Sequence, residues 1–119
     1  MKDFEPIAII GRGAFGEVRV CRIKETGEIV AMKKMNKADM ICKNQIAHVR
    51  AERDVLATSG NPWIVELKFS FQDDKYLYLV MEYLAGGDLM TLLMKKDILR
   101  EDEAKFYIAE AVMTHVFLY

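Results

Sequence analysis

Three glycines near the N-terminus have the spacing of a phosphate-binding loop. Gly11, Gly13 and Gly16 follow the pattern GxGxxG directly after an apolar run. Glycine suits such a loop because a side chain would keep backbone N–H groups away from phosphate oxygens. The pattern alone is weak, and a plain glycine-rich hairpin turn stays open as an alternative. A dinucleotide-binding loop would lead into a helix, whereas the residues after Gly16 alternate polar and apolar like a strand.

Lys33 and Glu52 are the charged residues that could complete such a site. Lys33 lies on the same side of an expected strand as Ala31, whose small side chain leaves room for a flat ring. A lysine at the end of a strand is usually solvated, so Lys33 by itself indicates little. Glu52 falls within the apolar stripe of an expected helix, where a carboxylate is unfavourable without a cationic partner. We therefore predict a Lys33–Glu52 ion pair that aims the ammonium group at a phosphate.

The elements that must position these residues change character along the chain. Alternation with a period of two predicts strands at residues 17–20 and 65–72. An apolar run at 7–10, β-branched residues at 29–33 and a turn before 76–81 predict three more, which gives five antiparallel strands. Apolar residues spaced by three and four predict helices at 44–58, 88–95 and 102–119. We expect a compact α+β unit that ends near Tyr83. The last helix is apolar nearly all round, which is typical of a helix that a larger structure buries.

Six segments carry a resemblance to a known family: residues 10–18, 37–40, 48–56, 69–73, 78–88 and 91–97. The glycine loop continues to Val18 in the form GxGxxGxV, and residues 30–33 read VAMK. With these features in order, the chain resembles the N-terminal lobe of a eukaryotic protein kinase of the AGC class. The sequence of these segments is most similar to the NDR/LATS group of serine/threonine kinases. The resemblance runs from Phe4 to about Ala111 and is weaker beyond it.

The resemblance implies an α+β fold with a five-stranded antiparallel sheet and one main helix, followed by two helices of an incomplete helical C-lobe. Residues 4–83 would then be the ATP-binding N-lobe. Residues 84–119 would be the exit of the hinge and the first helices of a truncated C-lobe. The function implied is ATP-dependent phosphoryl transfer to protein hydroxyls, as in serine/threonine protein kinases. A non-catalytic regulatory or partner-binding lobe stays open as the alternative.

The resemblance also implies which residues surround ATP. The phosphates would be bound by the glycine loop and the ion pair, at Gly11, Gly13, Phe15, Gly16, Lys33 and Glu52. The adenine ring would be packed by apolar side chains and bound at the hinge, by Ile10, Val18, Ala31, Met81 as gatekeeper, and the backbones of Glu82 and Leu84. Asp88 would lie near the ribose hydroxyls. Its position after two glycines is equally typical of a residue that begins a helix.

The motifs that supply the catalytic base and the metal ligands in this family do not occur in the 119 residues. These motifs are H-R-D-x-x-x-x-N and D-F-G, and the sequence contains neither. We therefore expect no catalytic residue and no Mg²⁺ ligand here, and no useful phosphoryl transfer by these residues alone. A truncated gene model or a spliced product would explain such a chain.

Composition and charge exclude several classes of protein. The chain is 52% apolar and 29% charged with two prolines, which is typical of a globular domain. A net charge of −1 lacks the basic excess of a nucleic-acid or anionic-membrane binder. Cys21 and Cys42 have no spacing of a disulfide framework or a zinc site.

Compartment and partners follow from the same features. The first residues do not form a signal peptide, and no apolar stretch is long enough to span a membrane, so we expect a soluble protein of the cytoplasm or nucleus. ATP is the expected ligand. A protein substrate and a MOB-like coactivator are expected only for the complete kinase, and these residues do not predict where the coactivator binds.

Overall fold

The computed structural model describes residues 2–14, 16–58 and 60–116. The chain divides into two compact units. Unit 1 comprises Met1–Thr58 and Val65–Tyr83, and unit 2 comprises Ser59–Ile64 and Leu84–Tyr119. No helix of the described residues is long and apolar enough to cross a membrane.

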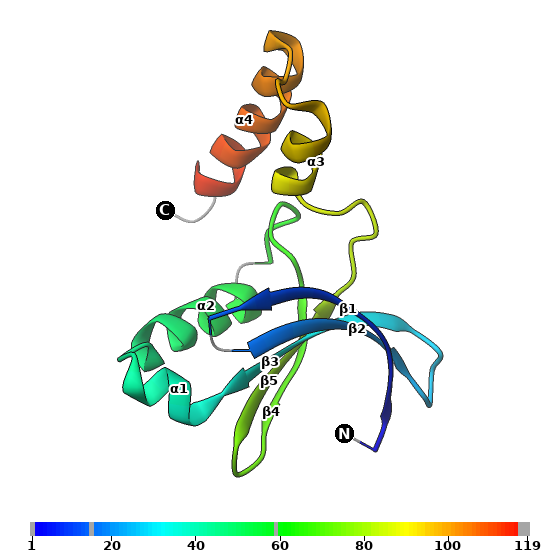
Figure 1. The fold of residues 1–119 in the computed structure, drawn as a ribbon, viewed down its shortest axis with the longest axis vertical. Coiled ribbons are helices and arrows are strands. Elements are labelled where there is room, and N and C mark those ends of the chain that lie inside the picture. The colour runs from blue at the N-terminus through cyan, green and yellow to red at the C-terminus, as the bar shows by residue number, and fades with distance from the viewer. Residues whose placement is uncertain (1, 15, 59, 117–119) are drawn as a thin grey trace. The chain divides into compact units, whose positions relative to one another are not determined.

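Unit 1 is built on a five-stranded antiparallel sheet (Figure 1). The strands are β1 (Phe4–Gly13), β2 (Gly16–Ile23), β3 (Ile29–Asn36), β4 (Leu67–Gln72) and β5 (Tyr76–Glu82). Their order across the sheet is β1-β2-β3-β5-β4, so β1 and β4 form the two edges. All five predicted strands are present, and the α+β fold class is confirmed. Strands β1 and β2 are longer than predicted at both ends, because Gly13 pairs with Gly16 at the loop and Phe4 pairs with Ile23 at the other end.

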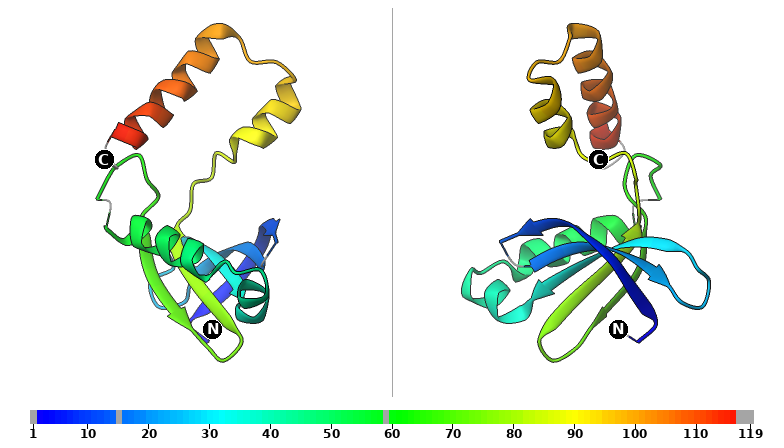
Figure 2. Two further views of the ribbon diagram at one scale, coloured as in Figure 1. Left: turned by 90° about the vertical axis from the view of Figure 1, so that its left-hand side faces the viewer. Right: turned by 45° about the vertical axis from the view of Figure 1, so that its right-hand side comes forward.

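Each face of the sheet carries its own hydrophobic cluster. On one face, Met35 and Leu79 are buried against Met40 and Val49, which come from the helices α1 (Lys37–Cys42) and α2 (Ile46–Thr58). The other face buries a cluster of strand residues, namely Cys21, Val30, Met32, Tyr78 and Val80. The alternation of side chains along β3 and β5 therefore supplies two cores, because successive residues point to opposite faces. Figure 2 shows α1 and α2 together beside the curved sheet.

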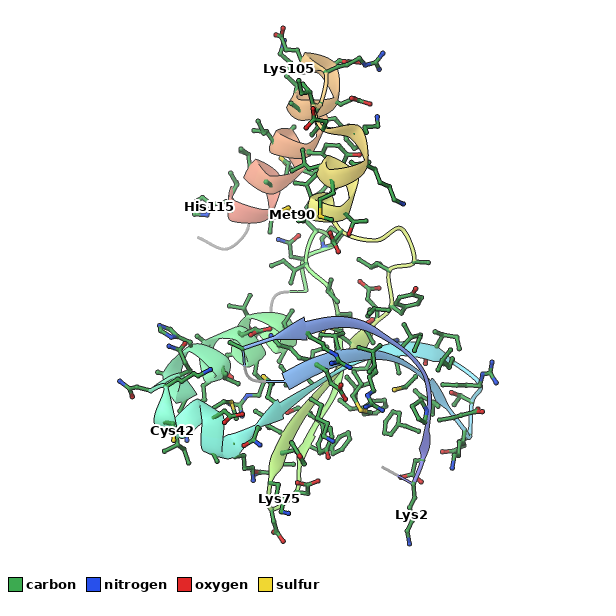
Figure 3. The ribbon with its side chains drawn as sticks, in the orientation of Figure 1. Lys2, Cys42, Lys75, Met90, Lys105 and His115 are labelled. Carbon is green, nitrogen blue, oxygen red and sulfur yellow. The ribbon has the colours of Figure 1, made fainter. Side chains whose placement is uncertain are left out.

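Helix α1 was not predicted from the sequence. Asn36 caps it, because its side-chain Oδ1 accepts hydrogen bonds from the backbone N–H groups of Ala38 and Asp39 at 2.9 and 3.3 Å. An asparagine followed by an acidic residue in the first turn is a signal for a helix start, and the short length of the helix obscured it. Cys42, at the end of α1, is exposed (Figure 3).

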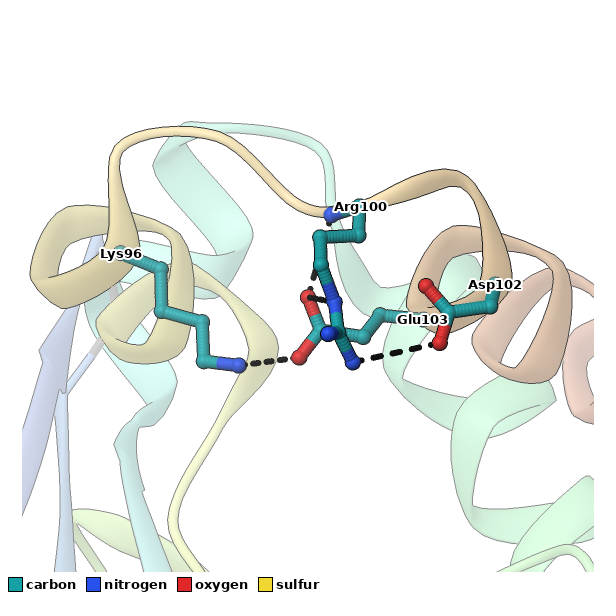
Figure 4. A network of polar contacts seen from close by, with 4 residues as sticks. All are labelled: Lys96, Arg100, Asp102 and Glu103. Atoms are coloured by element: carbon teal, nitrogen blue, oxygen red, sulfur yellow. Dashed lines mark hydrogen bonds and ion pairs between the residues drawn. The ribbon is translucent and has the colours of Figure 1, made fainter.

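Unit 2 contains α3 (Leu89–Lys96) and α4 (Glu101–Val116). Both helices agree with the predicted ones apart from their ends, and residues 117–119 of the predicted last helix lie outside the described residues. Figure 4 shows the polar network at the turn between them. Glu103 pairs with Lys96 and accepts the backbone N–H of Arg100 at 3.0 Å, while Arg100 also pairs with Asp102. This arrangement fixes the start of α4.

The apolar side chains of α4 are not buried. No residue of α3 or α4 in the described range is buried, and Phe106, Ile108 and Val116 are each more than half exposed. The sequence expectation that α4 needs a larger structure to cover it is in keeping with this exposure. The side chains themselves are apolar, so water does not stabilise them in this position.

Candidate functional site

The three glycines of the loop differ in what surrounds them. A Cβ atom built on Gly16 would lie 1.8 Å from the backbone oxygen of Lys34, so only glycine fits there. A Cβ atom on Gly13 would meet nothing within 4 Å, and none of the three glycines has a positive φ. The fold therefore explains why residue 16 is glycine, but it gives no steric reason for glycine at position 13. An open backbone at Gly13 leaves room for a ligand to approach its N–H group.

Strand register brings the predicted site residues of unit 1 onto one face of the sheet. Val18 of β2 lies opposite Lys33 of β3, and Ala31 lies opposite Met81 of β5. Opposite residues in an antiparallel pair share a face, and so do residues two apart on one strand. Gly11 of β1 continues the row because it lies opposite Val18. The sheet thus gathers residues that are far apart in the sequence.

A cavity of about 370 Å³ lies between the glycine hairpin and β3. Its walls include backbone of the glycine loop and the side chain of Lys33. The lining residues are Gly11, Arg12, Gly13, Ala14, Gly16, Glu17, Val18, Lys33 and Met35. Four of the residues predicted to bind phosphates therefore share one cavity. Of the other two, Phe15 lies outside the described residues, and Glu52 contacts Lys33 without lining the cavity.

The predicted Lys33–Glu52 ion pair is present. Lys33 Nζ lies 2.7 Å from Glu52 Oε1, and this contact joins β3 to α2 across the cavity-bearing face. The reason given for it from the sequence was wrong in one respect. The side chain of Glu52 is 41% exposed, and in α2 only Val49 is buried, so Glu52 does not lie within a buried apolar stripe. The pair is held by charge and geometry rather than by a need to neutralise a buried carboxylate.

Lys43 is a further contact of the glycine loop that the sequence did not indicate. Its Nζ donates a hydrogen bond to the backbone oxygen of Ala14 at 3.1 Å. Lys43 is the C-cap of α1, so this helix and the loop are joined. Sequence reasoning missed the contact because α1 itself was missed.

Of the remaining predicted residues, Ile10 lies in β1, Met81 and Glu82 end β5, and Leu84 and Asp88 follow it. Ile10 is 51% exposed, Met81 is half-buried, and Glu82 donates its backbone N–H to the oxygen of Glu66 at 3.0 Å. The sheet therefore carries the predicted residues of β1, β2, β3 and β5, and Glu52 joins them from α2 through its contact with Lys33. Leu84 and Asp88 belong to the other unit, unit 2, where Leu84 is exposed.

Asp88 is the N-cap of α3. Its carboxylate accepts the backbone N–H of Thr91 at 2.6 Å. This hydrogen bond to the backbone holds the pKa of Asp88 below its ordinary value. The helix-start interpretation of Asp88 is confirmed, and its role toward a ribose stays a prediction. In the described part of the chain, no group of three His, Cys, Asp or Glu residues could hold a metal ion.

Comparison with known proteins decides the family. A family model described as the protein kinase domain matches residues 4–119. This chain belongs to the protein kinase domain family. The part of the kinase fold in this chain is the N-lobe, formed by the sheet with α1 and α2, followed by the start of the C-lobe. The resemblance seen in the sequence is confirmed.

Relatives of this kinase chain are named serine/threonine-protein kinases. CBK1 of Yarrowia lipolytica is 59% identical over 113 residues, which cover 95% of this chain and 19% of the relative. The tricornered kinase of Drosophila melanogaster is 57% identical over the same number of residues, covering 95% of this chain and 24% of the relative. CBK1 of Candida albicans is 57% identical, with 15% of its length covered. The chain thus spans a quarter or less of these relatives, which agree with an NDR/LATS-like kinase.

Proposed function

We propose that this chain is the ATP-binding lobe, with the first C-lobe helices, of a serine/threonine protein kinase. The Lys33–Glu52 ion pair beside the glycine cavity is the observation that carries the proposal. Residues 4–83 would form the N-lobe, and residues 84–119 would form the hinge exit and the start of the C-lobe. The division of the chain after Tyr83 supports this boundary.

The cavity suits the phosphates of ATP. Its glycine backbone offers N–H groups without side chains in the way, and Lys33 offers an ammonium group. In our proposal the N–H groups of Gly11, Gly13 and Gly16 and the Nζ of Lys33 bind phosphate oxygens. Glu52 holds Lys33 in place through its 2.7 Å contact. Phe15 belongs to the same loop and is proposed to cover the phosphates with it.

The adenine ring is proposed to lie on the same sheet face. Val18, Ala31 and Met81 share that face by register, and the small side chain of Ala31 leaves space for the ring. The other proposed contacts are apolar packing by Ile10, backbone hydrogen bonds with Glu82 and Leu84, and a carboxylate near the ribose from Asp88. Glu82 would accept with its carbonyl oxygen, because its N–H donates to Glu66.

Catalysis is proposed for the full-length kinase rather than for these residues alone. ATP supplies the γ-phosphoryl group, and the complete enzyme would transfer it to a protein hydroxyl with Mg²⁺. The 119 residues contain neither H-R-D nor D-F-G, the motifs that give the base and the metal ligands. Within this chain, the residues of the cavity would bind and orient the triphosphate. A protein substrate and a MOB-like coactivator are proposed for the complete kinase only.

The proposed compartment is the cytoplasm or the nucleus. Cys21 and Cys42 are both free thiols, which suits a reducing environment. Nucleic acid and membrane are not proposed as partners, since the net charge is −1.

Replacing Lys33 by Met tests the ATP site. ATP should raise the melting temperature of the wild-type chain, because a ligand that binds only the folded state stabilises it. The Lys33→Met variant should lose this shift, since the cation that faces the phosphates is gone. Lys24→Met, in the exposed turn between β2 and β3, is the matched control and should keep the shift. An undiminished shift in Lys33→Met would place the nucleotide elsewhere.

A non-catalytic lobe that binds a partner is the second candidate. The exposed apolar residues of α3 and α4, such as Met90, Met94 and Ile108, favour it because a partner could cover them. Light scattering and thermal melting of the purified chain distinguish the candidates. A monodisperse chain that melts cooperatively without any response to ATP would support the non-catalytic lobe. Aggregation of the chain would argue against it.

A further inference from the structure

Lys68 occupies a one-residue bulge in the edge strand β4. Leu67 lies opposite Met81 of β5, but the next pair joins Phe69 to Val80, so Lys68 has no opposite residue. A bulge changes the direction of a side chain and is frequent next to functional sites. This bulge lies across from the last residues of β5, where the hinge begins.

Two carboxylates from different segments pair with the ammonium group of Lys68. Its Nζ lies 2.7 Å from Glu28 Oε1, just before β3, and 3.9 Å from Glu66 Oε2, just before β4. The hydrogen bond with Glu28, followed by the charges of Glu28, Glu66 and Glu82, raises the pKa of Lys68. Lys68 therefore pairs with two carboxylates, and the Glu82 carboxylate is attached to this cluster through Glu66. The side chain of Lys68 is 23% exposed, which is less than the exposure of either carboxylate that pairs with it.

Glu82 is attached to the same cluster through its backbone and its side chain. Its N–H donates to the oxygen of Glu66 at 3.0 Å, and its Oε1 accepts the N–H of Glu66 at 3.4 Å. The second bond is long, so a small displacement of the carboxylate would break it. If Lys68 were neutral, Glu28, Glu66 and Glu82 would repel one another with no cation between them. The Glu82 carboxylate would then turn toward water, and the end of β5 would be held less firmly.

We propose that Lys68 is a positioning residue of the hinge: it balances the carboxylates of Glu28, Glu66 and Glu82 and so fixes the backbone of Glu82. The consequence for adenine binding rests on the proposed function, since Glu82 is there a backbone partner of the ring. The consequence for the β4–β5 contact does not depend on it.

The test uses the full chain and two separate readouts. The first is the hydrogen-exchange rate of the Glu82 amide by NMR, and the second is the affinity for adenosine by calorimetry. Loss of the bond from Glu66 N–H to Glu82 Oε1 leaves the bond from Glu82 N–H to the Glu66 oxygen less supported. Lys68→Met should therefore raise the exchange rate of the Glu82 amide about fivefold, on the order of one hydrogen bond, and weaken adenosine binding by a similar factor. Lys75→Met, at the far end of the same hairpin (Figure 3), is the matched control and should change neither.

Rescue separates a charge effect from a loss of packing. Lys68→Arg keeps the cation and should behave like wild type. Adding Glu28→Gln and Glu66→Gln to Lys68→Met removes the repulsion and should restore both readouts. High salt should also reduce the effect of Lys68→Met, because it screens exposed charges. If Lys68→Met alone unfolds the chain, the exchange rate and the adenosine affinity are compared between Lys68→Gln and the triple variant instead.

The outcomes are distinct. An unchanged exchange rate of the Glu82 amide in Lys68→Met overturns the proposal. A triple variant whose exchange rate does not return to the wild-type value overturns it as well. Faster exchange in a chain whose wild type binds no adenosine supports the role of Lys68 at the strand end and overturns the nucleotide site. Changes in both readouts, with rescue, support the whole proposal.

Discussion

At the scale of single residues, different factors account for glycine at each position of the loop. Gly16 is required by the backbone of β3, because any Cβ atom would overlap the Lys34 oxygen. Gly13 has open space, so its lack of a side chain matters to a ligand rather than to the fold. The shared spacing of the motif conceals this difference, and only the register of β2 against β3 reveals it.

Gly16→Ala should destabilise unit 1, and Gly13→Ala should not. We expect a loss of about 1–3 kcal/mol in the free energy of unfolding for Gly16→Ala, since the strands must separate to admit a methyl group. Gly13→Ala should stay within about 0.5 kcal/mol of wild type, as for an exposed substitution. Urea unfolding followed by circular dichroism measures both. Equal losses in the two variants would contradict the steric assignment.

Asp97 carries backbone strain at the end of α3. Its φ of 63° and ψ of −54°, with a hydrogen bond from Ile98 N–H to the Lys96 oxygen at 2.7 Å, describe a strained γ-turn. Asp97→Gly should therefore stabilise unit 2 by about 1 kcal/mol, because glycine adopts positive φ without a steric penalty. Thermal melting checks it. Asn44→Gly, at a φ of 52° that asparagine tolerates, is the comparison and should gain less.

At the scale of elements, the β4–β5 hairpin depends on one carboxylate. Asp73 Oδ1 accepts the backbone N–H groups of Lys75 and Tyr76 at 2.9 and 2.7 Å, and Oδ2 accepts the hydroxyl of Tyr78 at 2.8 Å. The backbone oxygen of Asp73 also accepts from Lys37 of α1. The turn thus connects the strand pair to the helix that follows β3.

The same contacts predict how stability depends on pH. The hydrogen bond from the Tyr76 amide, then that from Tyr78, lower the pKa of Asp73 below its ordinary 3.8. The ionised Asp73 therefore stabilises the fold above that pH, and this contribution is lost as the pH falls further. Asp73→Asn should flatten the acid limb of the stability curve. An acid limb identical to that of wild type would contradict this role.

Tyr78 gives the opposite dependence at high pH. Burial, and then the hydrogen bond to Asp73, raise the pKa of Tyr78 from 10.0 to about 12. Its contribution to stability is complete below pH 10 and is lost as the pH rises through 12. In an alkaline titration followed by absorbance, one of the five tyrosines should ionise late. Tyr78→Phe should remove that late step, and its persistence would assign the step to another tyrosine.

At the scale of the whole molecule, the two units should differ in protection from hydrogen exchange. Val30, Leu79 and Val80 are fully buried in unit 1, whereas α3 and α4 have no buried residue in the described range. Amides of β3 and β5 should therefore exchange much more slowly than those of α3 and α4. Exchange followed by mass spectrometry measures this. Equal protection would show that α3 and α4 are covered in solution by self-association or another contact.

Local patterns in the sequence were sufficient for most of the fold. Alternation, apolar runs, β-branched residues and turn signals predicted the strands, and the period of three and four predicted α2, α3 and α4, because these signals depend on neighbours along the chain. Helix α1 was missed because its 6 residues are too short for a periodic pattern. The strand predicted at 65–72 begins at Leu67 and contains the Lys68 bulge, since register depends on the partner strand.

The sequence by itself determined the family and the residue types of the site, because the glycine loop, Lys33 and Glu52 follow one another in a recognisable order. Tertiary structure decided what those residues touch. It showed that Glu52 is 41% exposed, that Lys43 contacts the glycine loop and that Lys68 pairs with the carboxylates of Glu28 and Glu66. These contacts join segments that are distant in the chain, and strand register and helix packing, rather than local spacing, bring such segments together.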